Sequence, residues 1–271
     1  MIDPIHIRRV DTGRITLNVR EVGSGPLVVF LHGITSNAAV WDPIMLALAG
    51  EFRCVAVDQR GHGLSDKPAE GYKAGDLARD VLALIDTLKA GPAVIVGHSL
   101  GARNAVVAAT IDPQLVKSVV AVDFTPFIEK EVLDTLAVRV NGGDRLFKSR
   151  EEIEAYLQDR YQKMPAAAIR QRAMTAFREV EGGLRPLADP GAMAQTAEGL
   201  REELETAFKA VSRPTLVVRG AESKLVSEAA LEKTRQLRPD MPVIVVENTD
   251  HYVTEEAPEE SIRFIREFAR A

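Results

Sequence analysis

The sequence predicts an α/β fold, in which helices cover both faces of a mostly parallel, eight-stranded sheet and a helical cap is inserted into the chain. Short apolar segments alternate with helical segments in both halves of the 271 residues. The alternation stops near Pro126 and resumes near residue 201. We therefore expect one core built from residues 1–126 and 201–271, and a cap built from residues 127–200, here called the inserted segment.

The first half of the core shows the strand and helix pattern in order. The segments "IHIRRV" and "ITLNVREV", joined by "DTG", predict an antiparallel hairpin. The strand "LVVFL" precedes a helix near 38–49, and "FRCVAVD" precedes a helix over 75–88. The strand "AVIVG" precedes an alanine-rich helix, and "VKSVVAVD" follows it. These strands are apolar on both faces, which is typical of a parallel sheet buried under helices.

The inserted segment shows helical periodicity interrupted by "NGGD", "EGG" and "ADPG", and it contains no clear strand. After it, "PTLVVRG", a helix near 227–237, "MPVIVVE" and the final helix "PEESIRFIREFA" restore the alternation. The second half of the core is therefore expected to complete the sheet that the first half begins.

Composition excludes several classes of protein. The net charge is −5 and there is no basic tract, which argues against nucleic acid and anionic membranes as partners. No apolar run is long enough to span a bilayer, and "MIDPIHIRRV" lacks the apolar stretch of a signal peptide. The single cysteine, Cys54, lies in a predicted buried strand and fits a reducing compartment. We expect a soluble cytoplasmic protein with no nucleic-acid or membrane partner, and a homodimer is left open.

The pattern G-x-S-x-G occurs at residues 97–101, between an apolar strand and a helix. Glycines on both sides allow a sharp turn that larger side chains would block. Such a turn places the hydroxyl of Ser99 above the sheet, next to the positive end of the helix. The pattern in this context predicts that Ser99 is a nucleophile.

A serine nucleophile needs a neighbouring base, and the sequence has five histidines. His251 follows the last strand, at the carboxyl edge of the sheet where open α/β sheets place their active sites, and is the predicted base. His6 lies in the opening hairpin and is read as structural. His62 is assigned a packing role, His32 lies in a loop whose backbone matters more than its imidazole, and His98 adjoins the serine and is not expected to face it.

The acid that orients the base is expected between Ser99 and His251 in chain order. Asp123 directly ends the strand "VKSVVAVD", beside the strand that carries Ser99, and is the preferred acid. Glu222, in "LVVRGAESKLVS", is the alternative after the penultimate strand. The oxyanion of the reaction needs backbone donors, which we expect to be the N–H groups of Leu100 and Ile34.

Four motifs occur together in the order "LHG", "DQRGHGLSDKP", "VGHSLGARN" and "DHY". In these motifs the chain resembles the α/β-hydrolase fold family over nearly its whole length. The resemblance implies an α/β-hydrolase fold and a serine hydrolase with a Ser-His-Asp triad.

A narrower resemblance rests on "RITLNVRE", "HGITSN", "DFTP", "GGLRPLA", "MAQTA" and "SKLVS". These stretches are similar to family members that cleave the enamide C–N bond of a small dicarboxylate, without metal or cofactor. The resemblance implies an amidase that releases acetate, ammonia, carbon dioxide and succinic semialdehyde, and it supports Asp123 as the acid. A carboxylesterase or a C–C bond hydrolase would use the same triad, and a non-catalytic receptor could retain it, so these alternatives stay open.

Two arginines of the inserted segment lie on predicted apolar helix faces. Arg139 continues a stripe from Ile128, and Arg160 lies in a stripe that ends at Tyr161. A buried charge needs a partner, and a substrate carboxylate would supply one. The narrower resemblance implies that Arg139, Arg160 and Tyr161 bind substrate carboxylates. The alternative is that the arginines reach solvent or pair with an acid of the inserted segment: Asp144, Glu154 or Asp159.

Overall fold

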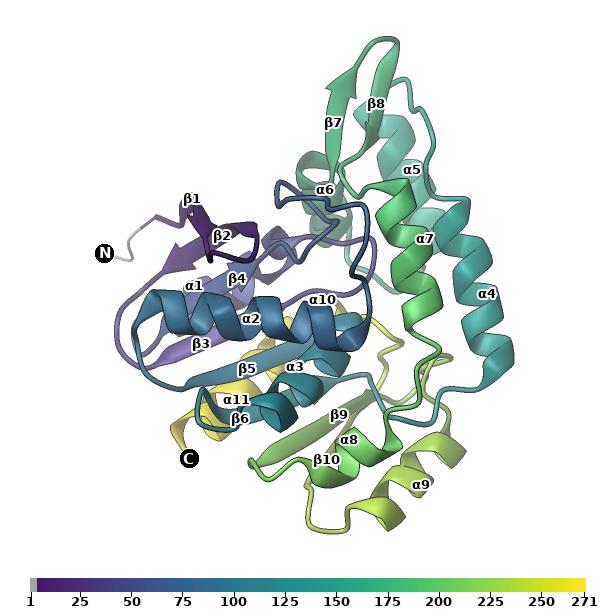
Figure 1. The fold of residues 1–271 in the computed structure, drawn as a ribbon. Helices are drawn as coiled ribbons and strands as arrows, with labels where there is room; N and C mark the ends of the chain where they lie inside the picture. Colours follow the sequence, from purple (N-terminus) through teal and green to yellow (C-terminus); the bar gives the residue numbers. More distant parts are fainter. Residues whose placement is uncertain (1–3) are drawn as a thin grey trace.

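The fold is centred on one eight-stranded sheet, seen in a computed structural model that describes residues 4–271 (Figure 1). The strand order is β1-β2-β4-β3-β5-β6-β9-β10. Strands β1 and β2 form the predicted antiparallel hairpin, β2 also pairs antiparallel with β4, and all remaining pairs are parallel. The strands are β1 (His6–Asp11), β2 (Thr16–Val22), β3 (Leu27–Leu31), β4 (Arg53–Val57), β5 (Ala93–His98), β6 (Val116–Val122), β9 (Thr215–Gly220) and β10 (Val243–Val246).

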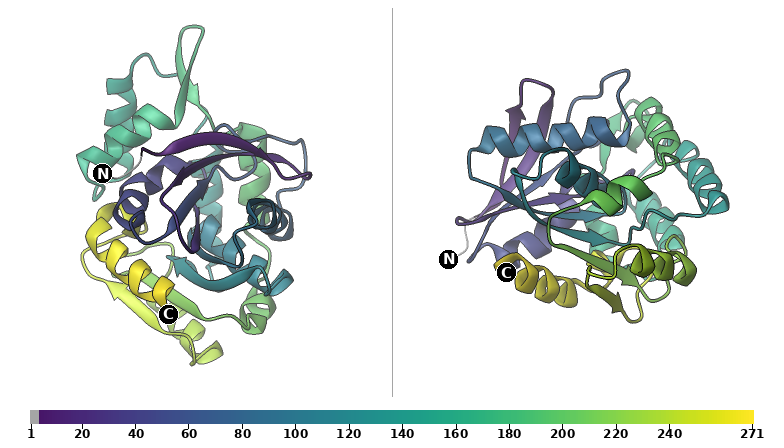
Figure 2. Two further views of the ribbon diagram at one scale, coloured as in Figure 1. Left: turned by 90° about the vertical axis from the view of Figure 1, so that its left-hand side faces the viewer. Right: turned by 60° about the horizontal axis from the view of Figure 1, so that its bottom comes forward.

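Helices cover both faces of this sheet, as Figure 2 shows for α2 (blue) and α11 (yellow) on opposite sides. The side chains of β3 alternate: Leu27, Val29 and Leu31 pack with α2, α3 and α8, whereas Val28 and Phe30 pack with η1, α1 and α11. This period of two explains why the strands are apolar throughout. The core helices are η1 (Ala38–Trp41), α1 (Asp42–Leu48), α2 (Ala74–Leu88), α3 (Leu100–Ile111), α8 (Glu205–Ala210), α9 (Glu228–Leu237), α10 (Val253–Glu256) and α11 (Pro258–Arg270).

The inserted segment leaves the core after β6 and returns to it before β9, and its helices lie to one side of the sheet (Figure 1). Its apolar side chains form two small clusters, separate from the two that flank the sheet, and Tyr72, Ile34 and Tyr252 of the core pack with them. The elements are α4 (Lys130–Asn141), α5 (Arg150–Arg160), α6 (Ala166–Thr175), β7 (Phe177–Val180), β8 (Gly183–Pro186) and α7 (Pro190–Gly199).

The prediction that the inserted segment contains no strand is wrong. Strands β7 and β8 pair antiparallel and form a hairpin that projects from the molecule (Figure 1). The sequence "EGG" supplies its turn, where Gly182 and Gly183 have φ angles of 83° and 150°. Each strand has only four residues, and Arg178 and Glu179 are exposed, so no apolar alternation marks the hairpin in the sequence.

Residues 4–271 show neither a membrane-spanning helix nor a cluster of metal ligands. No helix in this range is long and apolar enough to cross a membrane. The same residues contain no group of three or more histidine, cysteine, aspartate or glutamate side chains placed to hold a metal ion. Cys54 is buried in β4 as a free thiol, and burial raises the pKa of this thiol to about 12.

Candidate active site

Ser99 is the single residue between the end of β5 and the start of α3. Its backbone angles are φ 53° and ψ −113°, a conformation that costs a non-glycine residue about 1–3 kcal/mol. A Cβ atom on Gly97 would lie 2.3 Å from the carbonyl of Gly101, and one on Gly101 would lie 2.2 Å from the carbonyl oxygen of Leu31. The two glycines are therefore required by close backbone packing, and this packing holds Ser99 in its turn, as the G-x-S-x-G pattern predicts.

His251 and Asp123 lie together although 128 positions separate them. The distance from His251 Nδ1 to Asp123 Oδ2 is 2.6 Å. Asp123 is completely buried, and the His251 side chain is 13% exposed. With Nδ1–H donating to the carboxylate, Nε2 is left as the acceptor that a serine hydroxyl needs. The arrangement can therefore act as an oriented general base.

The buried carboxylate of Asp123 receives two further hydrogen bonds. The backbone N–H of Gly220 donates to Oδ1 at 3.0 Å, and the hydroxyl of Ser223 donates to Oδ2 at 2.6 Å. Both donors follow from the pairing of β6 with β9, because Gly220 ends β9 and Ser223 lies three residues later. These bonds offset the cost of burying the charge, and Ser223 was not predicted as part of the site.

Glu222, the alternative acid, lies elsewhere. Its side chain is 53% exposed and forms an ion pair with Lys163 of the inserted segment. The structure thus brings Asp123 to His251 and leaves Glu222 at the surface.

The loop after β3 presents a free N–H group beside the serine. Gly33, Ile34, Ser99 and His251 line one cavity. The loop is held by the N–H of Thr35, which donates to Nε2 of His62 at 3.2 Å. Among residues 4–271, the N–H groups of Ile34 and Leu100 have no hydrogen-bond acceptor. Two such donors can stabilise an oxyanion, and each typically contributes about 3–4 kcal/mol to the transition state.

Three buried histidines support this edge of the sheet. Burial lowers the pKa of His32 to about 4 and that of His62 to about 3, and it lowers the pKa of His98 well below its usual range. His32 Nε2 accepts a hydrogen bond from the N–H of Gln59 at 3.1 Å, so its imidazole contributes as well as its backbone. His98 Nε2 lies 2.8 Å from the carbonyl oxygen of His251. Their roles are structural, and none replaces His251 beside Asp123.

Three arginines of the inserted segment line the cavity that holds Ser99. Arg172, on α6, forms a two-point ion pair with Glu255, with distances of 2.7 Å from Nε to Oε1 and 2.5 Å from Nη2 to Oε2. Arg160, on α5, donates from Nη1 to the hydroxyl of Tyr156 at 2.8 Å, and its buried Nε has no partner among residues 4–271. Arg139, on α4, makes no ion pair within the same range. The cavity therefore carries two guanidinium groups that have no carboxylate partner in the part of the chain that the structure describes.

The alternative explanation for these arginines was pairing with acids of the inserted segment. Asp144 instead pairs with Arg185 at 2.9 Å. Neither Glu154 nor Asp159 forms an ion pair with another of the described residues. Arg139 is exposed as a whole residue although it lines the cavity, whereas Arg160 is half-buried.

Two tyrosines complete the charged end of the cavity. Tyr161 is buried, and its ring centroid lies 4.6 Å from that of Tyr252. Burial alone would raise the pKa of the Tyr161 hydroxyl, but the guanidinium groups of Arg172 and Arg160 lower it below its usual value. Arg172 and Tyr252 were not predicted from the sequence as part of the site. Arg172 shares a helix face with the apolar residues Ile169 and Ala173. An arginine on an apolar helix face is the pattern that identified Arg139 and Arg160, so the same pattern would have identified Arg172.

Known proteins resemble the chain over nearly its whole length. A family model described as the alpha/beta hydrolase fold matches residues 26–258. The chain is 60% identical to 2-(acetamidomethylene)succinate hydrolase of Mesorhizobium japonicum, over 97% of this chain and 95% of that protein. It is 31% identical to an esterase of Mycobacterium tuberculosis, over 96% of this chain and 88% of the esterase.

A solved structure gives the same result in three dimensions. The crystal structure of E-2-(acetamidomethylene)succinate hydrolase matches with a TM-score of 0.98 and 58% identity, covering 99% of this chain and all of the other. The range that the family model matches contains Ser99, Asp123 and His251. The chain belongs to the α/β-hydrolase fold family and is a hydrolase.

Proposed function

We propose that the chain hydrolyses the enamide C–N bond of 2-(acetamidomethylene)succinate, with Ser99, His251 and Asp123 as its catalytic triad. The observation that carries this proposal is the cavity in which Ser99 and His251 lie with Arg139 and Arg160, two cations that have no carboxylate partner among the described residues. A substrate with two carboxylates and one amide matches both parts of the cavity. A relative that is 60% identical carries the name of this activity.

The first half-reaction forms an acetyl-enzyme. His251 Nε2 accepts the hydroxyl proton of Ser99 as Oγ attacks the acetyl carbonyl carbon. The resulting oxyanion accepts hydrogen bonds from the N–H groups of Ile34 and Leu100. When the C–N bond breaks, His251 returns its proton to the departing nitrogen, which leaves as an enamine.

The second half-reaction restores the enzyme. A water molecule gives a proton to His251 and attacks the acetyl carbonyl, and the proton then returns to Ser99 Oγ as acetate leaves. The enamine tautomerises to an imine, a second water converts the imine to an aldehyde and ammonia, and the aldehyde acid loses carbon dioxide. One substrate and two waters thus give acetate, ammonia, carbon dioxide and succinic semialdehyde.

The proposed substrate-binding residues are Arg139, Arg160 and Tyr161. Guanidinium groups bind carboxylates through two parallel hydrogen bonds, and such charge-assisted bonds contribute about 1.5–3 kcal/mol each. Because Arg172 is already neutralised by Glu255, it supports Tyr161 and Tyr252 rather than adding a third free charge. In this proposal residues 127–200 act as a cap that recognises the substrate.

We also propose that the protein works in the cytoplasm and needs no cofactor. The buried free thiol of Cys54 is compatible with a reducing cytoplasm. The steps above use only side chains, backbone N–H groups and water, so the proposal requires no cofactor.

The test is to incubate the purified protein with 2-(acetamidomethylene)succinate and to measure acetate and succinic semialdehyde over time. We expect many turnovers per protein with equal amounts of the two products. A neutral aryl acetate and an enamide lacking both carboxylates serve as comparison substrates, and both should have a lower kcat/KM. At most one acetate per protein molecule would instead support a receptor, and a higher kcat/KM for the aryl ester would support an esterase.

A further inference from the structure

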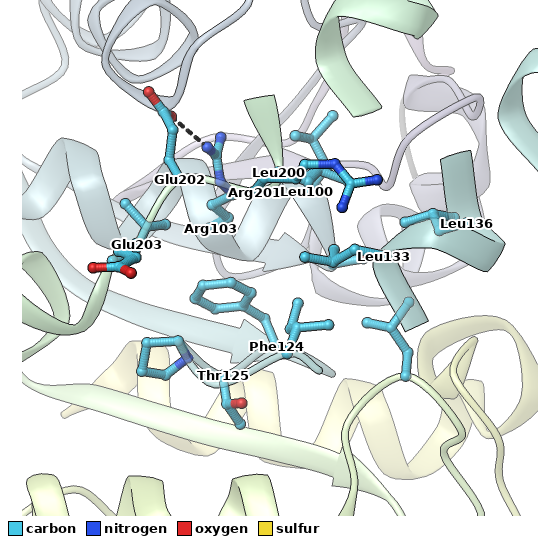
Figure 3. Close-up of a pocket in the computed structure, with 15 residues that line it drawn as sticks. Leu100, Arg103, Phe124, Thr125, Leu133, Leu136, Leu200, Arg201, Glu202 and Glu203 are labelled. Carbon is cyan, nitrogen blue, oxygen red and sulfur yellow. Dashed lines mark hydrogen bonds and ion pairs between the residues drawn. The ribbon is translucent and has the colours of Figure 1, made fainter. Parts of the chain in front are cut away.

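A second cavity adjoins Ser99 on another side. Its volume is about 110 Å³, and Ser99, Leu136 and Leu225 line both this cavity and the one that holds the arginines. Figure 3 shows Phe124, Leu133 and Leu136 around the same space. Ser99 therefore lies where two cavities meet, and we call the second one the acyl cavity.

The acyl cavity differs from the arginine-lined cavity in polarity. Most of its lining is apolar, and these apolar residues include Leu100, Phe124, Ile128, Leu133 and Leu204 together with the shared leucines. Its two cations are already neutralised, because Arg103 is paired with Glu202 and Arg201 lies 2.7 Å from Asp134. Glu202 and Glu203 also line it, so within residues 4–271 the cavity offers no unpaired cation to a carboxylate, and its apolar part is suited to an aliphatic group.

The geometry of the reaction decides which part of the substrate enters this cavity. In the tetrahedral intermediate, the carbon bonded to Ser99 Oγ carries an oxygen, a nitrogen and the acyl substituent. The oxygen faces the N–H groups of Ile34 and Leu100, and the nitrogen with its dicarboxylate faces His251 and the arginines. The acyl substituent, which is the remaining group on this carbon, therefore points toward the apolar cavity.

We propose that the acyl cavity receives the acyl substituent and that the protein hydrolyses enamides with chains longer than acetyl, in particular propionyl and butyryl. This inference rests on the proposed function. A water molecule needs about 10–15 Å³ of cavity volume, and a methyl group is of similar size. Acetyl would therefore fill only a small part of the 110 Å³. Burying each further methylene favours binding by a factor of about four.

The first measurement compares acetyl, propionyl and butyryl forms of the same enamide dicarboxylate with the wild-type protein. We expect kcat/KM for the two longer substrates to be within about threefold of the acetyl value or above it. A butyryl value more than about thirtyfold below the acetyl value would overturn the inference. Failure to hydrolyse the acetyl substrate at all would count against the proposed function, so the two failures are distinguishable.

Two substitutions of Leu133 test the cavity in opposite directions. Leu133→Trp fills the acyl cavity from α4, and the ratio of butyryl to acetyl kcat/KM should fall at least tenfold. Leu133→Ala enlarges the cavity, and the ratio of hexanoyl to acetyl kcat/KM should rise above the wild-type ratio. Circular dichroism establishes that each variant is folded.

The matched control lies on the same helix. Val138 is 74% exposed and lines neither cavity, so Val138→Trp should leave the activity and the acyl preference unchanged. A cavity that serves only as a water channel would give equal losses on all acyl lengths in Leu133→Trp, and that result would contradict the proposal.

Discussion

The carboxyl edge of the sheet and the inserted segment hold their functional side chains in different ways. At the sheet edge, Ser99 and Asp123 sit on backbone with φ angles of 53° and 48°, directly after the parallel strands β5 and β6. In the inserted segment, Arg139 and Arg160 reach the cavity on long side chains from α4 and α5, and one of them is exposed. Proton transfer requires tightly defined distances, whereas attraction between charges tolerates movement. The difference supports the proposal that the core carries the reaction and the inserted segment carries the selection of substrate.

The strongest test of the core is Ser99→Ala. Removing the hydroxyl removes the proposed nucleophile, and because triad members act as a unit we expect kcat to fall on the order of a millionfold. Substrate binding should survive, because the arginines are untouched, and equilibrium dialysis can measure it. A residual rate within tenfold of wild type would show that another group is the nucleophile.

Asp123→Asn tests which acid orients the base. An amide at this position can hold His251 in the wrong tautomer, and the corresponding change in a serine-protease triad lowers kcat about ten-thousandfold. Glu222→Gln is the matched control, since that side chain is exposed and paired with Lys163, and it should cost little. The reverse order of the two effects in a kcat measurement would contradict the assignment of Asp123.

Arg139→Met and Arg160→Met test the inserted segment. Losing one charge-assisted contact of about 1.5–3 kcal/mol should lower kcat/KM on the dicarboxylate roughly 10- to 150-fold. Methionine keeps much of the aliphatic stem, which limits the loss of packing. Hydrolysis of a neutral aryl acetate should change little, because it has no carboxylate to bind.

Arg170→Met is the control for these arginine variants, because Arg170 is exposed on α6 and lines neither cavity beside Ser99. Equal losses on both substrates in Arg160→Met would instead assign this arginine to the stability of the inserted segment.

The smallest expected effect concerns the stability of the core at low pH. The pKa of His32 is about 4 in the folded protein and about 6.5 when unfolded, so between these values the unfolded chain binds more protons. The free energy of unfolding should therefore fall as pH drops below 6.5, by about 1 kcal/mol from His32 alone between pH 6.5 and 5.5. Urea titrations at several pH values measure this slope.

His32→Gln should flatten that pH slope, while His6→Gln, on the exposed strand β1, should change it less. An unchanged slope in His32→Gln would mean that other groups account for the acid sensitivity. His62 and His98 contribute in the same direction, because burial lowers their pKa values too.

The core could be predicted from the sequence because its signals are local. Each parallel strand is a short apolar run, and the turn at Ser99 is marked by two glycines that the close packing requires. The hairpin of β7 and β8 was missed, since its strands are short, partly charged and held by a contact distant in sequence. Phe147 pairs with Leu184 there, with N–H to O distances of 2.9 and 2.8 Å.

The site was predictable to a different degree for each residue. Chain order alone left both Asp123 and Glu222 as acids. What places Asp123 at His251 is the pairing of β6 with β9, which brings the donors of Gly220 and Ser223 to its carboxylate. Such support comes from residues about a hundred positions away, and no local pattern encodes it.

The position of the two ends of the inserted segment has a further consequence for how such proteins diversify. Pro126 precedes the segment, Arg201 follows it, and both residues line the acyl cavity, so the chain leaves the core and returns to it at nearby points. An inserted segment whose two ends lie close together can be lengthened, shortened or exchanged without shifting the register of any strand. The entropic cost of closing such a loop grows only slowly with its length. Recombination at these two points could therefore replace one inserted segment with another as a single unit.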